Sequence, residues 1–468
     1  MPVHMLVGID DFGGTREHGR ISLRAVYTQG YLSKISLVNL HMSLPPPKTS
    51  LRPLPPMGLG ECLVGEEEKS LVLAALEHKQ LFRYYGFKAG SVPAMAATLE
   101  QEFAAAVGTR FALGVTSGTA ALEVALGALG IGPGDDVIIP VWSWISCFTA
   151  VVRLGARPVL AEVDETLNLD PAEIPRLCTA RTKAVLVVHY QGVPADMNAI
   201  MAAARAAKLK VIEDCAESAG ATYQGRAVGS IGDIGTFSFQ TRKIISAGEG
   251  GMIVTNDGRL YERAVRMSDV GQYRTFHEKL QAASEGAFSG SNFRMNELTA
   301  AVALAQFRRL PRMVTHLRSL RERLMEQIGG LPGVAFRRIP DPAGDLGFET
   351  YLYLPRAGLV TKLRELLAAS GVNCSQHTGT YCHYARAYCQ SGAAHAPGAS
   401  PFSGLVPWPA PGYRERDFPR TNALIARMMA VPLGVLYSLE NVDTIAAAIG
   451  KAAAVVLTPQ PTLARAAR

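Results

Sequence analysis

One lysine lies in a segment where lysine is uncommon. Lys243 stands in "GTFSFQTRKIISAGEGGMIVTND", residues 235–257, between a strand-like apolar run and the glycine-rich run "SAGEGG". A lysine that cannot reach water is costly, and clustered glycines are costly unless the backbone needs their freedom. A lysine amine can form a Schiff base with an aldehyde and can later move protons as the freed amine. Lys243 is therefore a candidate for covalent catalysis.

Three further patterns could complete a site around this amine. Asp214 ends the apolar run "KVIED", and a carboxylate at the carboxyl end of a strand could keep a heteroaromatic nitrogen protonated. The small-residue turn in "VTSGTAAL" would open a helix at Thr119, and a helix that begins right after "SGT" would offer free N–H groups to a phosphate. Trp144, in "PVWSWISC", could stack on a flat ring. With Lys243, these residue types describe a pocket for pyridoxal 5'-phosphate.

The elements that must position these residues follow an alternating pattern. Short apolar runs are separated by helical patterns such as "TAALEVALGALG" and "PADMNAIMAAARAAK". Strands separated by helix-length segments predict an α/β fold with a mostly parallel sheet and helices on both faces. The predicted strands lie within residues 135–141, 156–164, 182–190, 209–217, 235–239 and 250–257.

The chain divides into four predicted regions. Residues 1–56 end in a proline-rich linker pattern, "SLPPPKTSLRPLPPMG", and we expect an N-terminal extension outside the catalytic fold. Residues 57–310 form the predicted large α/β domain, which holds the cofactor. A long helix opens the predicted smaller C-terminal α+β domain, residues 311–456, and residues 457–468 form a frayed tail.

Composition narrows the class of protein. A hydrophobic content of 48% with 19% charged residues is typical of a globular protein with a large core. We find no apolar run long enough to cross a bilayer and no export signal, and the seven cysteines are an odd number. These features predict a cytoplasmic protein with reduced thiols and no membrane partner. The net charge of +7 is spread along the chain, so we expect no nucleic acid partner either.

Several segments of the sequence together resemble one enzyme family. "TSGTAALEVALGALGIGPGDDVIIP", "TKAVLVVHYQGVPADM", "VIEDCAESAGATYQGRAVGSIGDIGTFSFQ", "GEGGMIVTND" and "GSNFRMNELTAAVALAQFRRL" are similar to successive motifs of the DegT/DnrJ/EryC1/StrS aminotransferases. The resemblance covers residues 60–455 and is most specific up to about residue 310. It implies a fold type I enzyme that depends on pyridoxal phosphate and acts on keto-sugars or keto-cyclitols.

The resemblance also assigns residues. It implies that Lys243 holds the cofactor, that Asp214 faces the pyridine nitrogen, and that Trp144 stacks on the ring. Ser238 would bind the phosphate together with Gly118 and Thr119. Asn292, in "GSNFRMNE", would reach the phosphate of the neighbouring subunit, which implies a homodimer with shared active sites.

Two positions depart from the family pattern. Glu217 stands where glutamine is usual, facing the cofactor's phenolic oxygen, and a carboxylate there would be repelled unless it is protonated or turned aside. Arg242 precedes the lysine where serine or threonine is usual. Its side chain would either pair with a substrate anion or point to solvent.

Substrate contacts and metal binding are less clearly indicated. His189 and Tyr190 end a predicted strand that faces the site, and His383 lies in a segment that contributes a substrate-side loop in the family. These three residues are substrate candidates, with structural roles as the alternative. Residues 373–395 contain several cysteines and histidines, but without a paired C-x-x-C framework we predict no metal.

The sequence therefore predicts a pyridoxal phosphate-dependent aminotransferase. It would move an amino group from glutamate or glutamine to a keto-sugar or keto-cyclitol, in amino-sugar, polysaccharide or natural-product biosynthesis. One alternative is a lysine-dependent elimination or oxidation of an amino acid or amino sugar. Another is a ligand-sensing module that has lost catalysis.

Overall fold

A computed structural model describes residues 53–79, 81–84, 94–376, 381–395, 400–401 and 413–458. The predicted N-terminal extension lies outside the described residues except for residues 53–56, and the predicted tail does so except for residues 457–458. None of the described helices is both long enough and apolar enough to cross a membrane.

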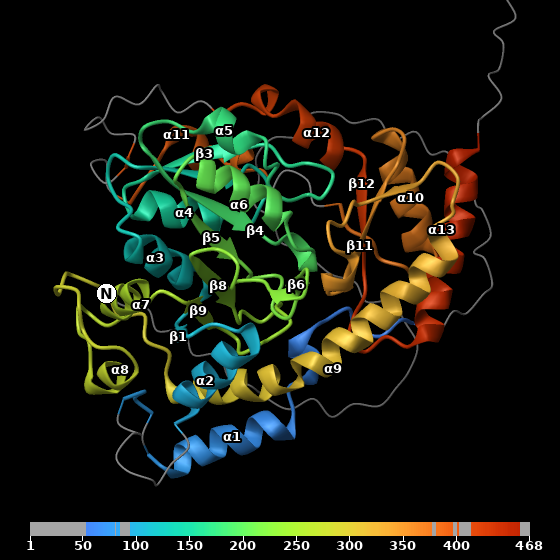
Figure 1. Cartoon of the computed structure of the whole chain (residues 1–468). Coiled ribbons are helices and arrows are strands. Elements are labelled where there is room, and N and C mark those ends of the chain that lie inside the picture. Colours follow the sequence, from blue (N-terminus) through green and yellow to red (C-terminus); the bar gives the residue numbers. More distant parts are fainter. Residues whose placement is uncertain are drawn as a thin grey trace, which may run out of the picture. The chain divides into compact units, whose positions relative to one another are not determined.

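A seven-stranded sheet lies within the predicted large domain (Figure 1). Strand β9 runs antiparallel to both of its neighbours, β1 and β8, and the pairings of the other strands are parallel. This arrangement confirms the predicted α/β fold. In sheet order, the strands are β1 (Phe111–Val115), β9 (Gly251–Thr255), β8 (Ile234–Ser238), β5 (Lys210–Asp214), β4 (Thr182–Val188), β2 (Asp136–Pro140) and β3 (Arg157–Ala161).

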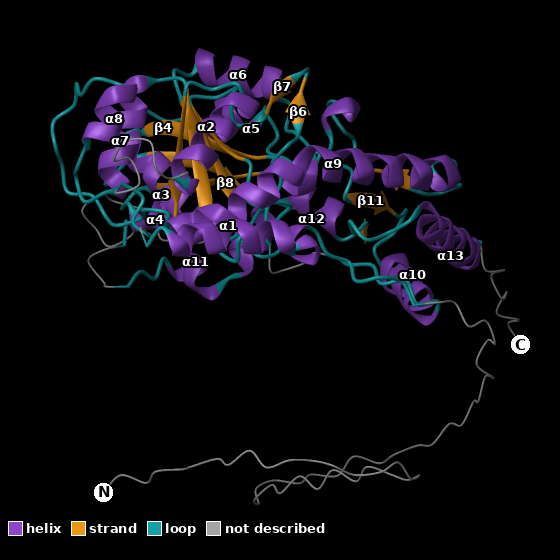
Figure 2. Ribbon diagram, turned by 90° about the horizontal axis from the view of Figure 1, so that it is seen from below, coloured by secondary structure: helices purple, strands orange, loops and turns teal. Residues whose placement is uncertain are grey.

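Helices cover both faces of this sheet, as Figure 2 shows from a second direction. Alternate residues of one strand enter different cores: Val137 and Ile139 pack in one cluster, whereas Ile138 packs in another. Because both faces are buried, the strands are continuous apolar runs in the sequence. One face is covered by α3 (Gly118–Ala128), α4 (Ser146–Arg153) and α7 (Gly258–Ser268), and the other by α2 (Met95–Val107), α5 (Glu173–Leu177), α6 (Met197–Ala206) and α9 (Glu297–Ile328).

A smaller antiparallel sheet lies toward the C-terminus. Its order is β10 (Ala335–Phe336), β11 (Glu349–Tyr353) and β12 (Met428–Pro432). Helices α10 (Gly358–Ala369) and α13 (Leu439–Leu457) pack beside it, and α13 also packs on α9. Figure 1 shows α9 passing from the large sheet to the small one. The predicted boundary at residue 310 falls inside this helix, so the division at that residue stays a prediction.

The sequence pattern does not predict the first strand or the start of α9. Strand β1, "FALGV", precedes the predicted phosphate turn, and the pattern gave no separate signal for it. The long helix was expected from residue 311, but it begins at Glu297 and continues through Pro311. The remaining regular elements are α1 (Glu66–Glu77), α8 (Thr275–Leu280), α11 (Ala387–Ser391), α12 (Pro419–Ile425), β6 (Thr222–Tyr223), β7 (Arg226–Ala227) and the 3-10 turns at Gly60–Leu63, Tyr190–Gly192, Pro342–Gly344, His383–Ala385 and Glu415–Asp417.

Candidate active site

A cavity of about 600 Å³ lies at the carboxyl ends of β5 and β8. Ligands of open parallel sheets bind at such an edge, and the volume is within the range of small-molecule sites. The cavity brings together seven of the residues that the sequence singled out: Gly118, Thr119, Trp144, Asp214, Glu217, Ser238 and Lys243.

One end of the cavity is suited to a phosphate. Ser117 caps α3 by accepting a hydrogen bond from the N–H of Ala120 at 3.0 Å. The N–H groups of Gly118 and Thr119 precede that bond in the first turn, where a helix leaves N–H groups without internal partners. A Cβ on Gly118 would lie 2.7 Å from the Cβ of Ser238, so only glycine lets the helix approach the serine this closely. The site therefore combines free N–H groups and a hydroxyl beside the positive end of a helix dipole.

Asp214 is buried beside the cavity. One carboxylate oxygen accepts from the N–H of Ala216 at 3.0 Å, and the other accepts from the thiol of Cys147 at 3.3 Å. Burial raises the pKa of Asp214, because taking the carboxylate out of water disfavours its charged form. A cationic ring nitrogen in the cavity would supply the opposite charge that this carboxylate lacks. The residues present therefore fit pyridoxal phosphate at the ring as well as at the phosphate.

The amine of Lys243 contacts a carboxylate. Its Nζ lies 3.2 Å from Oε1 of Glu217, whose other oxygen accepts from the N–H of Gln191 at 3.2 Å. The backbone of Lys243 is held on both sides, by the carbonyl of Gln240 and by the N–H of Gly60. Glu217, the residue that replaces the expected glutamine, is thus directed at the lysine in this structure.

Trp144 and Trp142 play different roles in the same segment. The side chain of Trp142 is buried against Tyr190, with ring centroids 4.5 Å apart. Trp144 is 53% exposed, although it lines the cavity. A large exposed indole beside a polar cavity is available to stack on a flat ring.

Two substrate candidates lie behind the cavity wall. Both ring nitrogens of His189 are engaged: Nδ1 accepts from the N–H of Ala195 and Nε2 contacts Glu213, each at 3.0 Å. Tyr190 is buried against Trp142 and does not line the cavity. The next residue, Gln191, does line it.

His383, the third substrate candidate, is also buried and away from the cavity lining. Its Nε2 lies 3.0 Å from the hydroxyl of Ser143, and burial lowers the pKa of its imidazole to about 3. Tyr381, two residues earlier, lines the cavity instead.

The metal prediction and the predicted homodimer with shared sites stay untested. Among the described residues, His189, Glu213 and Cys215 are close enough to share an ion. Glu213 already accepts from three backbone N–H groups as well as from His189, however, which gives the cluster a structural role. Of the cysteine and histidine segment, His377 lies outside the described residues. Asn292 is exposed and does not line the cavity of its own chain.

Several cavity residues were missed by sequence analysis. They include Leu59, Gln191, Gln240, Phe348 and Tyr381. Gln191 could have been suspected because it follows a strand of the parallel sheet and so lies at the ligand edge. Phe348 and Tyr381 come from segments more than a hundred residues after Lys243, and no local pattern marks them.

Comparison with known proteins points to one family. A sequence profile described as the DegT/DnrJ/EryC1/StrS aminotransferase family matches residues 65–450. The chain is 33% identical over 337 residues to the dTDP-3-amino-3,4,6-trideoxy-alpha-D-glucose transaminase of Streptomyces venezuelae, covering 72% of this chain and 81% of the relative. It is 36% identical over 288 residues to the L-glutamine:2-deoxy-scyllo-inosose aminotransferase of Streptoalloteichus tenebrarius, covering 58% and 66%.

A solved structure agrees with these sequence matches. The crystal structure of S. venezuelae DesV in complex with a ketimine intermediate superimposes with a TM-score of 0.71 at 28% identity. The superposition covers 86% of this chain and 99% of that chain. The shared fold therefore extends over nearly the whole of the solved protein.

Proposed function

Because this chain belongs to the DegT/DnrJ/EryC1/StrS aminotransferase family, whose members depend on pyridoxal phosphate, we propose that it transfers an amino group from glutamate or glutamine to a keto-sugar or keto-cyclitol. Both acceptor classes occur among its relatives: one is named a transaminase of a dTDP-linked amino sugar and another an aminotransferase of a scyllo-inosose. The glutamine donor is named in the second relative. A role in amino-sugar, polysaccharide or natural-product biosynthesis follows from that substrate class.

The observation that carries the proposal is the shared cavity. Lys243, buried Asp214 and the first turn of α3 come from three separate parts of the sequence and line one cavity. An amine, a carboxylate and a phosphate cradle are the groups that pyridoxal phosphate requires.

Each of these residues has a definite task in the proposed reaction. Bound pyridoxal phosphate supplies an aldehyde that bonds to amines and a ring that accepts electron density from the adjoining carbon. Lys243 would hold the cofactor through Nζ, and the same amine, once free, would take up the proton that the donor's α-carbon releases. Asp214 holds a proton on the ring nitrogen, since an adjacent anion favours the cation.

Other residues of the cavity wall would bind the phosphate and orient the ring of the cofactor. The N–H groups of Gly118 and Thr119 and the hydroxyl of Ser238 bind the phosphate, and Trp144 covers the ring. The Thr119 hydroxyl contacts that of Ser146 at 2.7 Å, which couples the phosphate turn to the helix that follows Trp144.

A half-reaction tests the proposed function against its alternatives. Protein loaded with pyridoxal phosphate is mixed with L-glutamate or L-glutamine in the absence of an acceptor. We expect one keto acid per active site and a cofactor left in the amine form, with no ammonia beyond that of a blank. Release of ammonia over many turnovers would indicate elimination or oxidation instead. Tight cofactor binding without any keto acid would indicate a ligand-sensing module.

The quaternary structure is part of the same proposal. We infer a cytoplasmic homodimer in which the exposed Asn292 of one subunit completes the phosphate site of the other. Mixing a Lys243→Ala subunit with an Asn292→Ala subunit tests this inference. If sites are shared, mixed dimers regain activity because one of their two sites is intact. Unchanged, near-zero activity in a mixture shown to exchange subunits would contradict it.

A further inference from the structure

The cavity is lined by more acidic than basic side chains. Three of the lining side chains are acidic, Asp214, Glu217 and Glu249, and two are basic, Arg242 and Lys243. Lys243 is the nearer partner of Glu217 and is the residue proposed to carry the cofactor. Once its amine is committed to the cofactor, Arg242 is the remaining fixed cation among the described residues that line the cavity. A phosphate at the α3 end adds further negative charge, so an anionic substrate needs this cation.

The backbone that presents Arg242 is held in place. The N–H of Arg242 donates to the side-chain oxygen of Gln240 at 2.9 Å, and the N–H of Lys243 donates to the carbonyl of Gln240 at 2.8 Å. On the other side, the N–H of Thr241 donates to the carbonyl of Gly248 at 3.0 Å. These bonds fix the position from which the guanidinium extends, directly beside the reactive amine.

The guanidinium itself is available. Arg242 is exposed, and no ion pair to it is found within the described part of the chain. Arg294, the other arginine near a family motif, differs in both respects: its guanidinium lies 2.5 Å from Asp269, and it does not line the cavity. An arginine without a carboxylate partner presents several N–H donors in a planar fork that matches a carboxylate.

Tyr381 marks the space that Arg242 faces. Burial, reinforced by the charge of Glu217, raises the pKa of the Tyr381 hydroxyl to about 12, whereas the charge of Arg242 acts in the opposite direction. Both side chains line the cavity, so an anion there would meet a fixed cation beside a hydroxyl that stays protonated at neutral pH.

From this arrangement we propose that Arg242 is the subsite for the α-carboxylate of the amino donor. The inference rests on the proposed aminotransfer and names the residue that selects amino acids as donors. The carboxylate is preferred over a phosphate of the acceptor because it is attached to the very carbon whose amine must meet the position held by Lys243. Arg242, as the adjacent residue, is placed to bind a group one bond from that carbon.

Donor analogues with and without the carboxylate test this assignment. In the half-reaction of the loaded enzyme, Arg242→Gln should weaken the apparent affinity for L-glutamate and L-glutamine by roughly tenfold to a hundredfold, as expected for loss of a charged hydrogen bond. The apparent affinity of Arg242→Lys for these donors should lie between those of wild type and Arg242→Gln, because lysine keeps the positive charge but lacks the planar set of N–H donors. The limiting rate should change little. With 4-aminobutanamide, which is glutamine without its α-carboxylate, wild type and Arg242→Gln should perform equally.

A binding measurement without turnover separates this inference from the proposed function. Calorimetric titration of the holoenzyme with glutarate and its monoamide should show the same loss in Arg242→Gln. Glu249→Gln is the matched control, since it removes a charge of opposite sign from the same cavity and should not weaken binding. Equal affinities in wild type and Arg242→Gln would overturn the subsite. The subsite would also be overturned if Arg242→Gln lost affinity only for a phosphorylated acceptor and not for the amino donor. Glutarate binding that requires Arg242, in an enzyme that forms no keto acid, would instead preserve the subsite and overturn the proposed aminotransfer.

Discussion

Two regions of this molecule place acidic residues at the carboxyl ends of parallel strands, and the acid at the end of β5 lines the cavity described above. Glu162 follows β3, and Asp214 ends β5. Both lie at the edge of the sheet where ligands are expected. The surroundings of the two carboxylates differ in where their partners come from.

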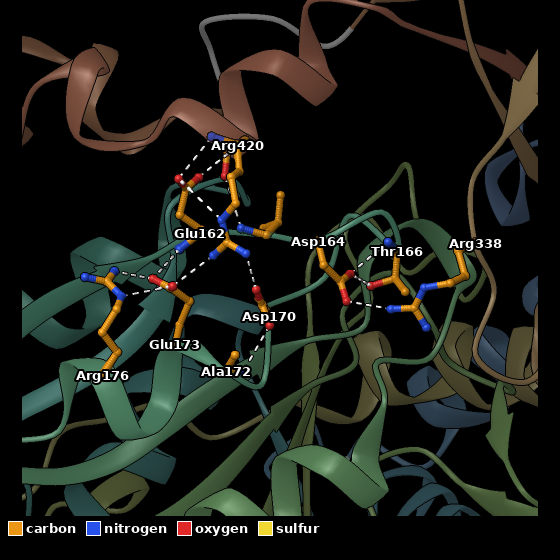
Figure 3. A network of polar contacts seen from close by, with 11 residues as sticks. Glu162, Asp164, Thr166, Asp170, Ala172, Glu173, Arg176, Arg338 and Arg420 are labelled. Carbon is orange, nitrogen blue, oxygen red and sulfur yellow. Dashed lines mark hydrogen bonds and ion pairs between the residues drawn. The ribbon is translucent and has the colours of Figure 1, made fainter.

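At the end of β3, polar groups of the chain itself bind the carboxylates of Glu162, Asp170 and Glu173. Glu162 accepts from the N–H groups of Thr421 at 2.7 Å and Arg420 at 3.1 Å. The Arg420 side chain also bonds Asp170 at 2.5 Å and Glu173 at 2.9 Å (Figure 3). This network joins residues 162–173 to α12 and supplies the carboxylates with partners from the chain itself.

At the end of β5, the partners are fewer and the space is open. Asp214 accepts from one backbone N–H and one thiol, and Glu217 accepts from one backbone N–H and contacts Lys243. The comparison shows that an acidic residue after a strand does not by itself define a site. A site requires, in addition, groups whose hydrogen bonds and charge are not fully satisfied by the protein.

The first prediction concerns Lys243, which we expect to be needed for turnover but not for the stability of the fold. Lys243→Ala should lower turnover by at least about a thousandfold, because it removes both the anchor and the proton carrier. The cofactor should also lose the visible absorbance that depends on a bond to the amine. In the absence of cofactor, unfolding by urea should be nearly unchanged. Multiple turnovers by this variant without an added amine would contradict the central assignment.

The second prediction addresses the close approach of α3 to Ser238. Gly118→Ala places a Cβ 2.7 Å from that of Ser238 and should weaken cofactor binding by roughly tenfold to a hundredfold, because overpacking costs about 1–3 kcal/mol. Equilibrium dialysis against pyridoxal phosphate measures the effect. Gly127→Ala is the control in the same helix: its Cβ meets the flexible side chain of Met267 at 3.1 Å, away from the cavity, and cofactor affinity should not change.

The third prediction tests the polar network at the end of β3. Glu162→Gln replaces one of two acceptor oxygens by an amide donor, which leaves a buried N–H of α12 without its acceptor. The free energy of unfolding should fall by about 2 kcal/mol, with cofactor affinity unaffected. Urea denaturation measures the first quantity and dialysis the second.

An exposed ion pair of the same region provides the comparison for that variant. Arg338 lies 2.6 Å from Asp164, but the arginine side chain is 49% exposed. Arg338→Ala should therefore cost less than about 1 kcal/mol, since exposed pairs contribute little. A larger cost for Arg338→Ala than for Glu162→Gln would mean that burial does not set the strength of the network.

The fourth prediction concerns the stability of the folded protein at low pH. Burial holds the pKa of His383 at about 3, below its value in the unfolded chain, so the unfolded state binds the proton first as the pH falls below about 6.5. The contribution to stability is complete above that pH and is lost by about 1.4 kcal/mol per unit as the pH falls toward 3. His383→Gln should reduce the slope of stability against pH by that amount. An unchanged slope would show that the imidazole is already charged in the folded protein.

Patterns within single segments were enough to predict most of the fold and several of the residues that line the cavity. Asp214 and Ser238 each end a strand of strong apolar character, Lys243 follows the second of these strands, and the "SGT" turn marks the start of a helix. The weaker predictions depended on which way a residue faces. His189 and Tyr190 were placed at the right end of the right strand, yet both turn into the core. Side-chain direction at a strand end depends on the turn that follows, here a 3-10 turn in which Gln191 has a φ of +48°.

The sequence by itself determined six of the seven strands of the sheet, their order along the chain and the residue types that suit a phosphate, a ring nitrogen and an aldehyde. Those features are local, because strand and helix periodicity and turn composition are properties of short segments. Tertiary structure alone decided that Glu217 meets Lys243 and that Arg294 pairs with Asp269, whereas Arg242 has no ion pair among the described residues. It also decided that the acids after β3 are bound by α12. Each of these outcomes depends on contacts between segments far apart in the chain, and such contacts are set by how the elements pack rather than by the residues around each position.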